Sequence, residues 1–275
     1  MTELNLITEM EEKMNDKTRM TIMKQREIYK AYSPDDMGAE QTDEEQGLPQ
    51  PPMEQPKKTE SVISLPKDFR SVIRKTDILD IMTERKSHRK YKQDDLTLTE
   101  LSFLLWSTQG VKKVIGNRKK ASLRTVPSAG ARHPLETYLF INQVEGLAPG
   151  LYHYLPLEHE LEYLRAAGEQ KEQLTKALCD QEFAGTAPVA FVWSVVPYRC
   201  EWRYGTKAQK YTLLDAGHVC QNLYLACEAI NCGVCAIGAY DQEQMDELLD
   251  LKPGPSGEET YECVIYAASV GKVQD

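Results

Sequence analysis

Residues 124–134 read Arg-Thr-Val-Pro-Ser-Ala-Gly-Ala-Arg-His-Pro, and they lead into an apolar run over 135–142. The small side chains of this loop let backbone N–H groups approach a flat or anionic ligand closely, and Gly130 can adopt dihedral angles closed to other residues. Pro127 and Pro134 stiffen the loop before a ligand binds. Taken alone, the pattern fits either a ligand-binding loop or an ordinary loop at the start of a strand.

The composition limits the class of protein. With 275 residues, the chain can bury a full core and form one or two domains. Its net charge of -9 and its pI of about 5.2 argue against a nucleic-acid partner or an anionic membrane partner. We find neither an apolar run near the roughly 20 residues that span a bilayer nor a signal peptide. Seven scattered cysteines fit reduced thiols, so we expect a soluble, cytoplasmic protein.

Residues 1–60 differ in composition from the rest of the chain. The stretch 33–58 is acidic and rich in Pro and Gln, so it offers too little apolar surface to offset the entropy lost on ordering. We expect an N-terminal Pro-rich, acidic arm over residues 1–60, which either covers a partner surface or stays mobile. The folded domain is then expected over residues 61–275.

Hydrophobic periodicity predicts several helices in this domain. Thr76 is a candidate N-cap for a helix that includes residues 78–82. Thr97 and Glu100 have the spacing of a capping box ahead of a second helix. The longest helical pattern covers residues 210–230 and is apolar on most of its sides, which predicts burial within the domain or at a subunit interface.

Apolar runs predict strands between these helices. Residues 135–142 are apolar on both faces and are expected to form a central strand, and residues 187–196 a second buried strand. The remaining runs predict a hairpin at 150–164, a strand at 234–241, a last strand at 261–270 and a basic loop at 112–120. Strands and helices do not alternate regularly, so we expect an α+β fold rather than a doubly wound parallel sheet.

Residues 84–91 read Glu-Arg-Lys-Ser-His-Arg-Lys-Tyr and combine four cations with a hydroxyl group. Arginine can hold a phosphate through a bidentate fork, lysine acts as a point charge, and serine donates a hydrogen bond. Seen in isolation, the segment fits a solvated basic face as well as a phosphate site.

Several common catalytic motifs are missing from the sequence. It has no G-x-G-x-x-G after a strand and no G-x-x-x-x-G-K-[ST], which argues against a dinucleotide-binding Rossmann half and a P-loop. The C-x-x-C at 232–235 lacks a second pair at zinc spacing, so we interpret it as apolar packing. Asp215 and His218 could belong to a hydrolase triad, but no serine or cysteine lies in the sequence context of a nucleophile elbow. His153 and His159 are expected to be surface or hairpin residues, and no metal site is predicted.

Taken together, these segments resemble the FMN-dependent nitroreductase family. Within it they look most like the SagB-type branch, which includes the azoline oxidases of ribosomal-peptide pathways. The resemblance rests on motifs in the family's order at 85–89, 124–136, 214–223 and 236–241, and it covers about residues 61–272. It implies an α+β sandwich, in which a mixed, mostly antiparallel sheet is flanked by helices. It also implies a homodimer with FMN sites built from both chains.

The resemblance implies roles for individual residues around FMN. Cations and Ser87 would hold phosphate and ribityl oxygens, and the loop at 127–130 would come from the partner chain to line the isoalloxazine ring. Gly238 and Ala239 would offer backbone N–H groups to flavin N5 and O4. The implied cofactor-binding residues are Arg85, Lys86, Ser87, Arg89, Arg124, Pro127, Ser128, Ala129, Gly130, Gln221, Ile237, Gly238, Ala239 and Lys272.

This sequence departs from the family pattern in two places. Many nitroreductases have an acidic residue before the glycine of the N5 loop, whereas here the pair is Gly238-Ala239, as in the SagB-type branch. A second cation after Lys272 is missing.

Lys210-Tyr211 resembles the Lys-Tyr pair that serves azoline oxidases as general base and acid. To act as a base near pH 7, such a lysine must be desolvated or lie near another cation, because either condition favours the neutral amine. A solvated Lys beside a packed Tyr is an equally good interpretation.

Three functions are therefore open. The first is an FMN-dependent oxidoreductase that moves a hydride through flavin N5, from NAD(P)H to a nitroaromatic, quinone or similar acceptor by a ping-pong mechanism. The second is a SagB-type dehydrogenase that oxidises an organic substrate such as a peptide azoline, with Lys210 and Tyr211 as the proton-handling pair. The third is a non-catalytic flavin-binding or partner subunit. The expected partners are a small-molecule or peptide substrate and a second copy of the chain, with no nucleic acid and no membrane.

Overall fold

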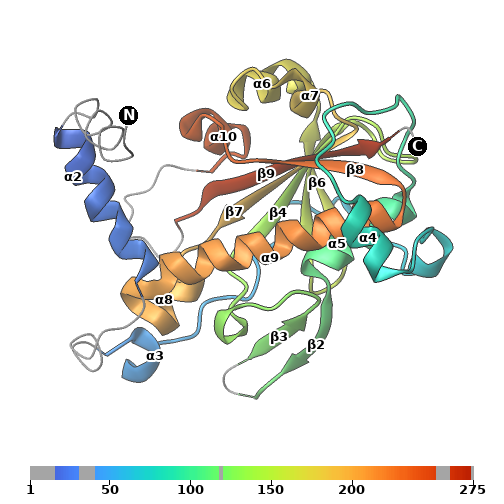
Figure 1. Ribbon diagram of the computed structural model, residues 1–275. Coiled ribbons are helices and arrows are strands. Elements are labelled where there is room, and N and C mark those ends of the chain that lie inside the picture. Colours follow the sequence, from blue (N-terminus) through green and yellow to red (C-terminus); the bar gives the residue numbers. More distant parts are fainter. Residues whose placement is uncertain (1–15, 31–40, 118–119, 252–260, 274–275) are drawn as a thin grey trace. The chain divides into compact units, whose positions relative to one another are not determined.

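The computed structural model describes residues 16–30, 41–117, 120–251 and 261–273, which belong to two compact units, 1–41 and 42–275 (Figure 1). In the first unit, the helix α2 (Asp16–Gln25) is followed by the 3-10 helix η1 (Arg26–Tyr29). The second unit contains the sheets and the other described helices.

The second unit is built on a seven-stranded sheet with the strand order β1-β6-β5-β4-β7-β9-β8. Every strand pair in it is antiparallel. The strands are β1 (Val62–Ser64), β4 (Leu135–Ile141), β5 (Gly150–Leu155), β6 (Glu160–Ala166), β7 (Val189–Val195), β8 (Cys232–Ile237) and β9 (Cys263–Lys272). β4 lies between β5 and β7 and is buried along its whole length, which confirms the prediction of a central strand.

Helices cover both faces of this sheet (Figure 1). α5 and α9 pack on one face, and α6, α7 and α10 pack on the other. The helices are α3 (Asp43–Gln46), α4 (Ile78–Glu84), α5 (Leu98–Gln109), α6 (Gln170–Ala177), α7 (Glu182–Gly185), α8 (Tyr198–Tyr204), α9 (Ala208–Ala229) and α10 (Gln242–Leu248). Short 3-10 turns are η2 (Phe69–Ser71), η3 (Ala129–Ala131) and η4 (Gly205–Lys207). The fold is therefore α+β, as predicted.

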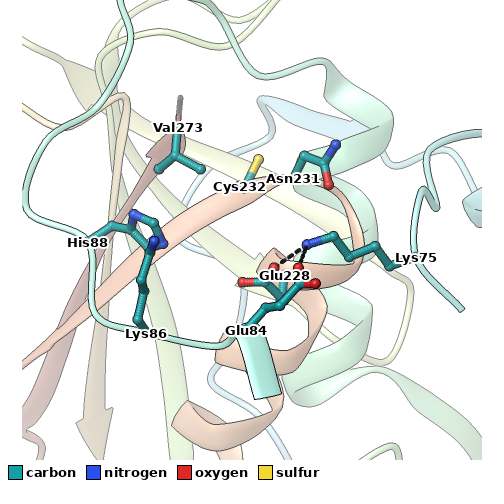
Figure 2. A pocket seen from close by; sticks show the side chains of 8 residues that line it. All are labelled: Lys75, Glu84, Lys86, His88, Glu228, Asn231, Cys232 and Val273. Carbon is teal, nitrogen blue, oxygen red and sulfur yellow. Dashed lines mark hydrogen bonds and ion pairs between the residues drawn. The ribbon is translucent and has the colours of Figure 1, made fainter. Parts of the chain in front are cut away.

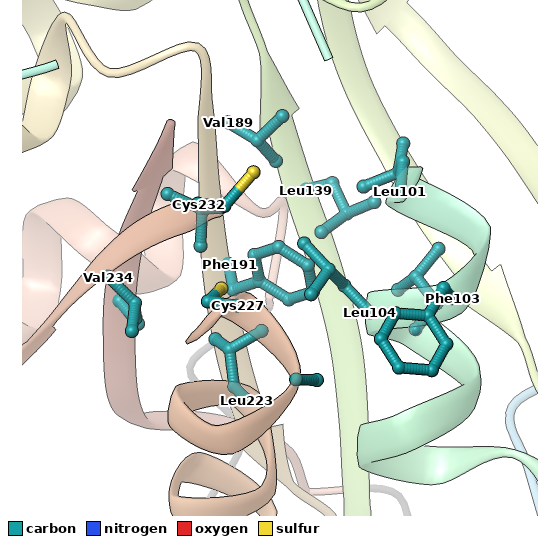
Figure 3. Packing of buried hydrophobic residues seen from close by; sticks show 14 of the residues in the cluster. Leu101, Phe103, Leu104, Leu139, Val189, Phe191, Leu223, Cys227, Cys232 and Val234 are labelled. Atoms are coloured by element: carbon teal, nitrogen blue, oxygen red, sulfur yellow. The ribbon is translucent and has the colours of Figure 1, made fainter. Parts of the chain in front are cut away.

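The core between α5, α9 and the sheet fixes the position of the long helix. Leu104 of α5 and Leu223 of α9 are fully buried, as are Leu139 of β4 and Phe191 of β7 (Figure 3). Burying each such side chain contributes about 1.5–3 kcal/mol relative to exposure. The predicted burial of the 210–230 helix within the domain is confirmed for the face of α9 that packs against the sheet.

Two local predictions were wrong. The N-cap of α4 is Asp77 rather than Thr76, because the Asp77 side chain accepts a hydrogen bond from the Leu79 N–H. Residues 112–115 of the expected basic loop belong to the strand β2 (Val111–Ile115), which pairs with β3 (Ala121–Arg124), and residues 118–119 lie outside the described residues. The lysines had suggested a solvated loop, but the aliphatic residues between them favour an extended strand. The predicted capping box of α5, from Thr97 to Glu100, is present.

Residues 42–60, called here the N-terminal strap, belong to the second compact unit. The Gln55 N–H donates to Glu136 over 2.9 Å, and the N–H groups of Lys58 and Thr59 donate to Glu162. This part of the predicted arm is therefore hydrogen-bonded to the sheet. Residues 1–15 and 31–40 of the arm lie outside the described residues.

The strap covers a buried charged network on the sheet. His153 was expected as a surface or hairpin residue; it lies in the hairpin of β5 and β6 but is fully buried, with Nε2 2.9 Å from Glu136 and Nδ1 3.4 Å from Glu162. Burial alone lowers the pKa of His153, but hydrogen bonds to the two carboxylates outweigh it and raise the pKa to about 9. Burial opposes ionisation of Glu136, whereas Arg199 and His153 lower its pKa to about 2. At neutral pH the network therefore contains paired charges.

His159, for which the same expectation was made, lies in the turn between β5 and β6 and is also buried. Its ring lies between the Ser102 hydroxyl at 2.8 Å and the Tyr154 hydroxyl at 2.7 Å. Burial is the largest cause that lowers the pKa of His159 to about 4, so this ring is neutral at physiological pH. Both histidines are buried because partners distant in the sequence satisfy their ring nitrogens.

The charged network around His153 should make the stability of the protein depend on pH. His153→Leu should lower the free energy of unfolding by about 3–5 kcal/mol near neutral pH, because it removes the buried cation that Glu136 and Glu162 share and leaves Glu136 with Arg199 alone. The pKa of His153 in the folded protein, about 9, lies above its ordinary value of 6.5. Its stabilisation is therefore complete below pH 6.5 and is lost as the pH rises through 9. Urea unfolding should show the gap between wild type and variant narrowing from pH 7 to pH 9.5.

His159→Leu is the matched control. Because the His159 ring is neutral throughout this range, the cost of removing it should be the same at pH 7 and pH 9.5. A His153→Leu gap that stays constant between these pH values would contradict the assignment of charge to His153.

Candidate functional site

The basic segment 85–89 runs alongside β8 and converges on a tyrosine of α9. Ser87 forms a parallel bridge with Val234, and its Oγ lies 2.8 Å from the Tyr224 hydroxyl. The same hydroxyl accepts a hydrogen bond from the Ala236 N–H over 2.9 Å. The guanidinium carbon of Arg85 lies 5.4 Å from the centroid of the Tyr224 ring. The structure therefore brings two predicted site residues, Arg85 and Ser87, together around Tyr224.

The side chains of Lys86 and His88, which alternate with those of Arg85 and Ser87, point into a separate pocket. Lys86 and His88 face a pocket of about 430 Å³, where Lys75 pairs with Glu84 and Glu228 (Figure 2). Its lining residues are Lys75, Glu84, Lys86, His88, Glu228, Asn231, Cys232 and Val273. Burial and the neighbouring charge of Lys86 lower the pKa of His88. An extended backbone sends successive side chains to opposite sides, so Lys86 is not brought together with Arg85 and Ser87.

Arg89 lies near α7, on the other face of the sheet from Tyr224, and β8 ends close to the remaining predicted residues. The exposed Arg89 guanidinium lies 5.9 Å from the centroid of the Phe183 ring in α7. Ile237 is buried as the last residue of β8, and Gly238 and Ala239 follow it as exposed residues. A Cβ atom added at Gly238 would meet no atom within 4 Å. The surface at Gly238 is therefore open.

The small-residue loop is held by the first half of α9. The Ala129 N–H donates to Asp215 Oδ1 over 3.3 Å, and the Ser128 hydroxyl accepts from the His133 N–H over 2.9 Å. The Asp215 carboxylate is buried, and burial is the main cause that raises its pKa. Asp215 precedes Tyr224 by nine residues, or about 14 Å along the helix. Within one chain the loop and the Arg85 group therefore lie apart on α9.

Gly130 is required by the loop's geometry. Its φ is +55°, in the region that favours glycine, and an added Cβ would lie 2.6 Å from the Tyr204 hydroxyl oxygen and 2.9 Å from Arg203 Cδ. The loop thus passes close to the end of α8. Pro127, at the start of the loop, is exposed.

Lys210 and Tyr211 lie in the first turn of α9. Both are half-buried, and the Tyr211 ring contacts Tyr204 with centroids 4.7 Å apart at an angle of 62°. The catalytic and packing interpretations of this pair both fit that position, so the catalytic role stays a prediction. Gln221 is an exposed residue of the same helix.

Two further predicted cations are engaged within the chain. Arg124 is buried and donates to Gln109, to Ser122 and to the Met53 carbonyl, each over 3.1 Å. Burial is the largest cause that lowers its pKa to about 10. Lys272 pairs with Glu100, the capping-box residue of α5. The structure does not bring Arg124 or Lys272 together with Arg85 and Ser87.

Comparison of the sequence with known protein families assigns the chain to one of them. The family model described as the nitroreductase family matches residues 82–272, which include the basic segment, the small-residue loop, α9 and β8. The chain belongs to the nitroreductase family. The predicted resemblance is confirmed, and nitroreductase-family proteins are oxidoreductases.

Individual relatives agree with this assignment. MJ1384 of Methanocaldococcus jannaschii, a protein named as a nitroreductase, is 33% identical over 177 residues, which are 64% of this chain and 85% of MJ1384. The microcin B17-processing protein McbC of Escherichia coli is 28% identical over 111 residues, 39% of this chain and 41% of McbC. The match therefore spans less than half of McbC.

A solved structure supports the nitroreductase fold. The crystal structure of a Ralstonia eutropha JMP134 protein, also named as a nitroreductase, matches with a TM-score of 0.60 and 26% identity over 78% of this chain and 90% of that one. Within the part of this nitroreductase-family chain that the structure describes, no helix is both long and apolar enough to cross a membrane.

Tyr224 was not among the residues predicted for this site in the nitroreductase-family chain. Tyr224 belongs to the helical pattern at 210–230 that was predicted to be buried, so it was interpreted as core, and the residue is indeed only 9% exposed. The signal that could have revealed it is the hydroxyl group, because a buried tyrosine hydroxyl needs a hydrogen-bond partner. Its partners, Ser87 and Ala236, belong to two motifs that had been identified separately.

Proposed function

We propose that this chain is an FMN-dependent oxidoreductase that transfers a hydride from a reductant such as NAD(P)H to a nitroaromatic, quinone or similar acceptor by a ping-pong mechanism. Membership of the nitroreductase family supports this reaction class. The observation that carries the proposal is the convergence of Arg85 and Ser87 on Tyr224, beside the strand that leads into Gly238 and Ala239.

The residues at this place fit a phosphorylated flavin. The Arg85 and Arg89 guanidinium groups contact aromatic rings, and no salt bridge to an acidic side chain is found for either among the described residues. The Arg85 cation and the exposed Ser87 hydroxyl, which both contact Tyr224, suit a phosphate group. The open surface at Gly238 suits a flat ring that approaches the backbone.

Bound FMN would supply the two-electron chemistry, with the hydride passing through N5. The chain's own residues would bind and orient the cofactor. Arg85 would neutralise the phosphate charge, and Ser87 would donate a hydrogen bond to it. The N–H groups of Gly238 and Ala239 would face the N5 and O4 edge of the ring, where donors stabilise negative charge.

We propose that a second copy of the chain completes the site. The loop at 127–130 and the Arg85 group are separated along α9, so a loop from the partner subunit would line the ring held by Arg85. α9 offers a surface for such a partner, since Leu213 and Leu214 are 54% and 52% exposed. A Cβ at Gly217 would meet no atom within 4 Å, so close approach is possible there. Burying the two leucines would favour association.

The first prediction concerns the phosphate contact. Arg85→Ala should weaken FMN binding by about 1.5–3 kcal/mol, because a charge-assisted hydrogen bond is lost. Lys86→Ala is the matched control, since it removes the same charge from the neighbouring residue, which faces the other pocket. Fluorescence titration of the apoprotein with FMN measures both. An unchanged dissociation constant in Arg85→Ala, or an equal loss in both variants, would remove Arg85 from the proposed contact.

A second candidate function is a SagB-type dehydrogenase acting on an organic substrate such as a peptide azoline. The relation to McbC and the Lys210-Tyr211 pair favour it. A third candidate is a flavin-binding or partner subunit without turnover. NAD(P)H oxidation by the purified protein would support the first candidate. Activity only with a peptide and its modifying partners would support the second, and bound FMN with neither activity the third.

The dehydrogenase candidate makes its own prediction. Lys210→Ala should abolish substrate dehydrogenation while FMN stays bound, because the general base is lost and the cofactor contacts remain. Lys207→Ala, which removes another half-buried lysine three residues earlier, is the control and should retain turnover. Equal turnover in Lys210→Ala and wild type would contradict the catalytic role and support the alternative, in which Lys210 is a solvated residue beside a packed Tyr211.

A further inference from the structure

Tyr224 joins three segments of the candidate site through one side chain. Its hydroxyl lies 2.8 Å from Ser87 Oγ and 2.9 Å from the Ala236 nitrogen. Its ring lies 5.4 Å from the guanidinium carbon of Arg85. Tyr224 is 9% exposed and projects from α9, whose packing against the sheet fixes it. The side chain is therefore a rigid support for its neighbours.

The Tyr224 hydroxyl takes part in two hydrogen bonds. The Ala236 N–H can only donate, so the Tyr224 oxygen accepts from it. Either hydroxyl can donate in the bond between Tyr224 and Ser87, and we take Tyr224 as the donor because its oxygen already accepts from Ala236. In this arrangement Ser87 keeps its own proton for another partner, and Ser87 is exposed. A chain of donors runs from the backbone of β8 through Tyr224 to an outward serine hydroxyl, and each bond polarises the next.

The same side chain also supports the cation. The face of the Tyr224 ring carries negative charge and attracts the Arg85 guanidinium, which limits the positions this long side chain samples. An outward hydroxyl proton and an oriented guanidinium group, held beside one another, match two oxygens of a phosphate group.

We propose that Tyr224 is a positioning residue that directs the Ser87 proton and the Arg85 guanidinium toward the phosphate of the cofactor. The inference rests on the proposed FMN function and goes beyond it, since Tyr224 itself does not contact the phosphate. Ala236 precedes Gly238 by two residues, so the same hydroxyl also ties the phosphate side of the site to the strand that enters the N5 loop.

The test compares two flavins that differ only in the phosphate. Tyr224→Phe keeps the ring and removes the hydroxyl, so the FMN dissociation constant should rise about tenfold, which is in the range of one lost hydrogen bond between neutral groups. Binding of riboflavin, which lacks the phosphate, should change little. Tyr152→Phe is the matched control, because its hydroxyl is also buried and hydrogen-bonded, to the Ala148 carbonyl. This control should bind both flavins like wild type.

A second variant isolates the route through the serine. Ser87→Ala alters an exposed residue and should weaken FMN binding by a similar factor. Adding Tyr224→Phe to Ser87→Ala should then cause little further loss, because the two hydroxyls act as one unit. Additive losses would overturn the inference, and so would an equal loss of FMN and riboflavin affinity in Tyr224→Phe.

The outcomes separate this inference from the proposed function. If the wild-type protein binds no FMN, both are overturned. If wild type binds FMN and Tyr224→Phe binds it equally tightly, only the positioning role is overturned. A selective loss of FMN affinity, absent from Tyr152→Phe and not increased in the double variant, supports it.

Discussion

The packing of α9 against the sheet is the constraint on which the candidate site depends. Leu223 and Cys227 lie in the core between α9 and β7, so the helix cannot slide or rotate without opening that core. Asp215 and Tyr224 project from this fixed helix, and each accepts a backbone hydrogen bond from a segment that carries site residues. The small-residue loop and the end of β8 are thereby held at a set spacing.

The two faces of the sheet are stabilised in different ways. α5 and α9 cover one face with apolar packing, and α6, α7 and α10 cover part of the other. The N-terminal strap crosses this second face where Glu136, His153 and Glu162 are buried. Buried charges are costly unless paired and hydrogen-bonded. Main-chain N–H groups of the strap complete that pairing, which explains why a segment poor in apolar residues is bound there.

The sequence predicted those elements whose causes are local. The capping box at Thr97 and the two-sided apolar run of β4 depend on residues a few positions apart, and both are present in the structure. The motifs at 85–89 and 124–130 were likewise identified from short patterns, and they support the family assignment.

The remaining features depend on contacts distant in the sequence. His153 is buried because Glu136 and Glu162 lie on neighbouring strands, and hydropathy alone gives a histidine no such partners. Lys86 and Ser87 face different places because of the bridge between Ser87 and Val234, which periodicity could not reveal. Tyr224 was interpreted as core because its hydroxyl partners come from two other segments.

The central claim is that the chain binds FMN and reduces it with a nicotinamide. The most direct measurement is the absorbance spectrum of the protein after incubation with FMN and desalting, recorded under nitrogen before and after addition of NADH or NADPH. We predict the bands of oxidised flavin, which bleach when the reductant is added. A desalted protein without flavin absorbance would contradict the assignment of a flavin site to this chain.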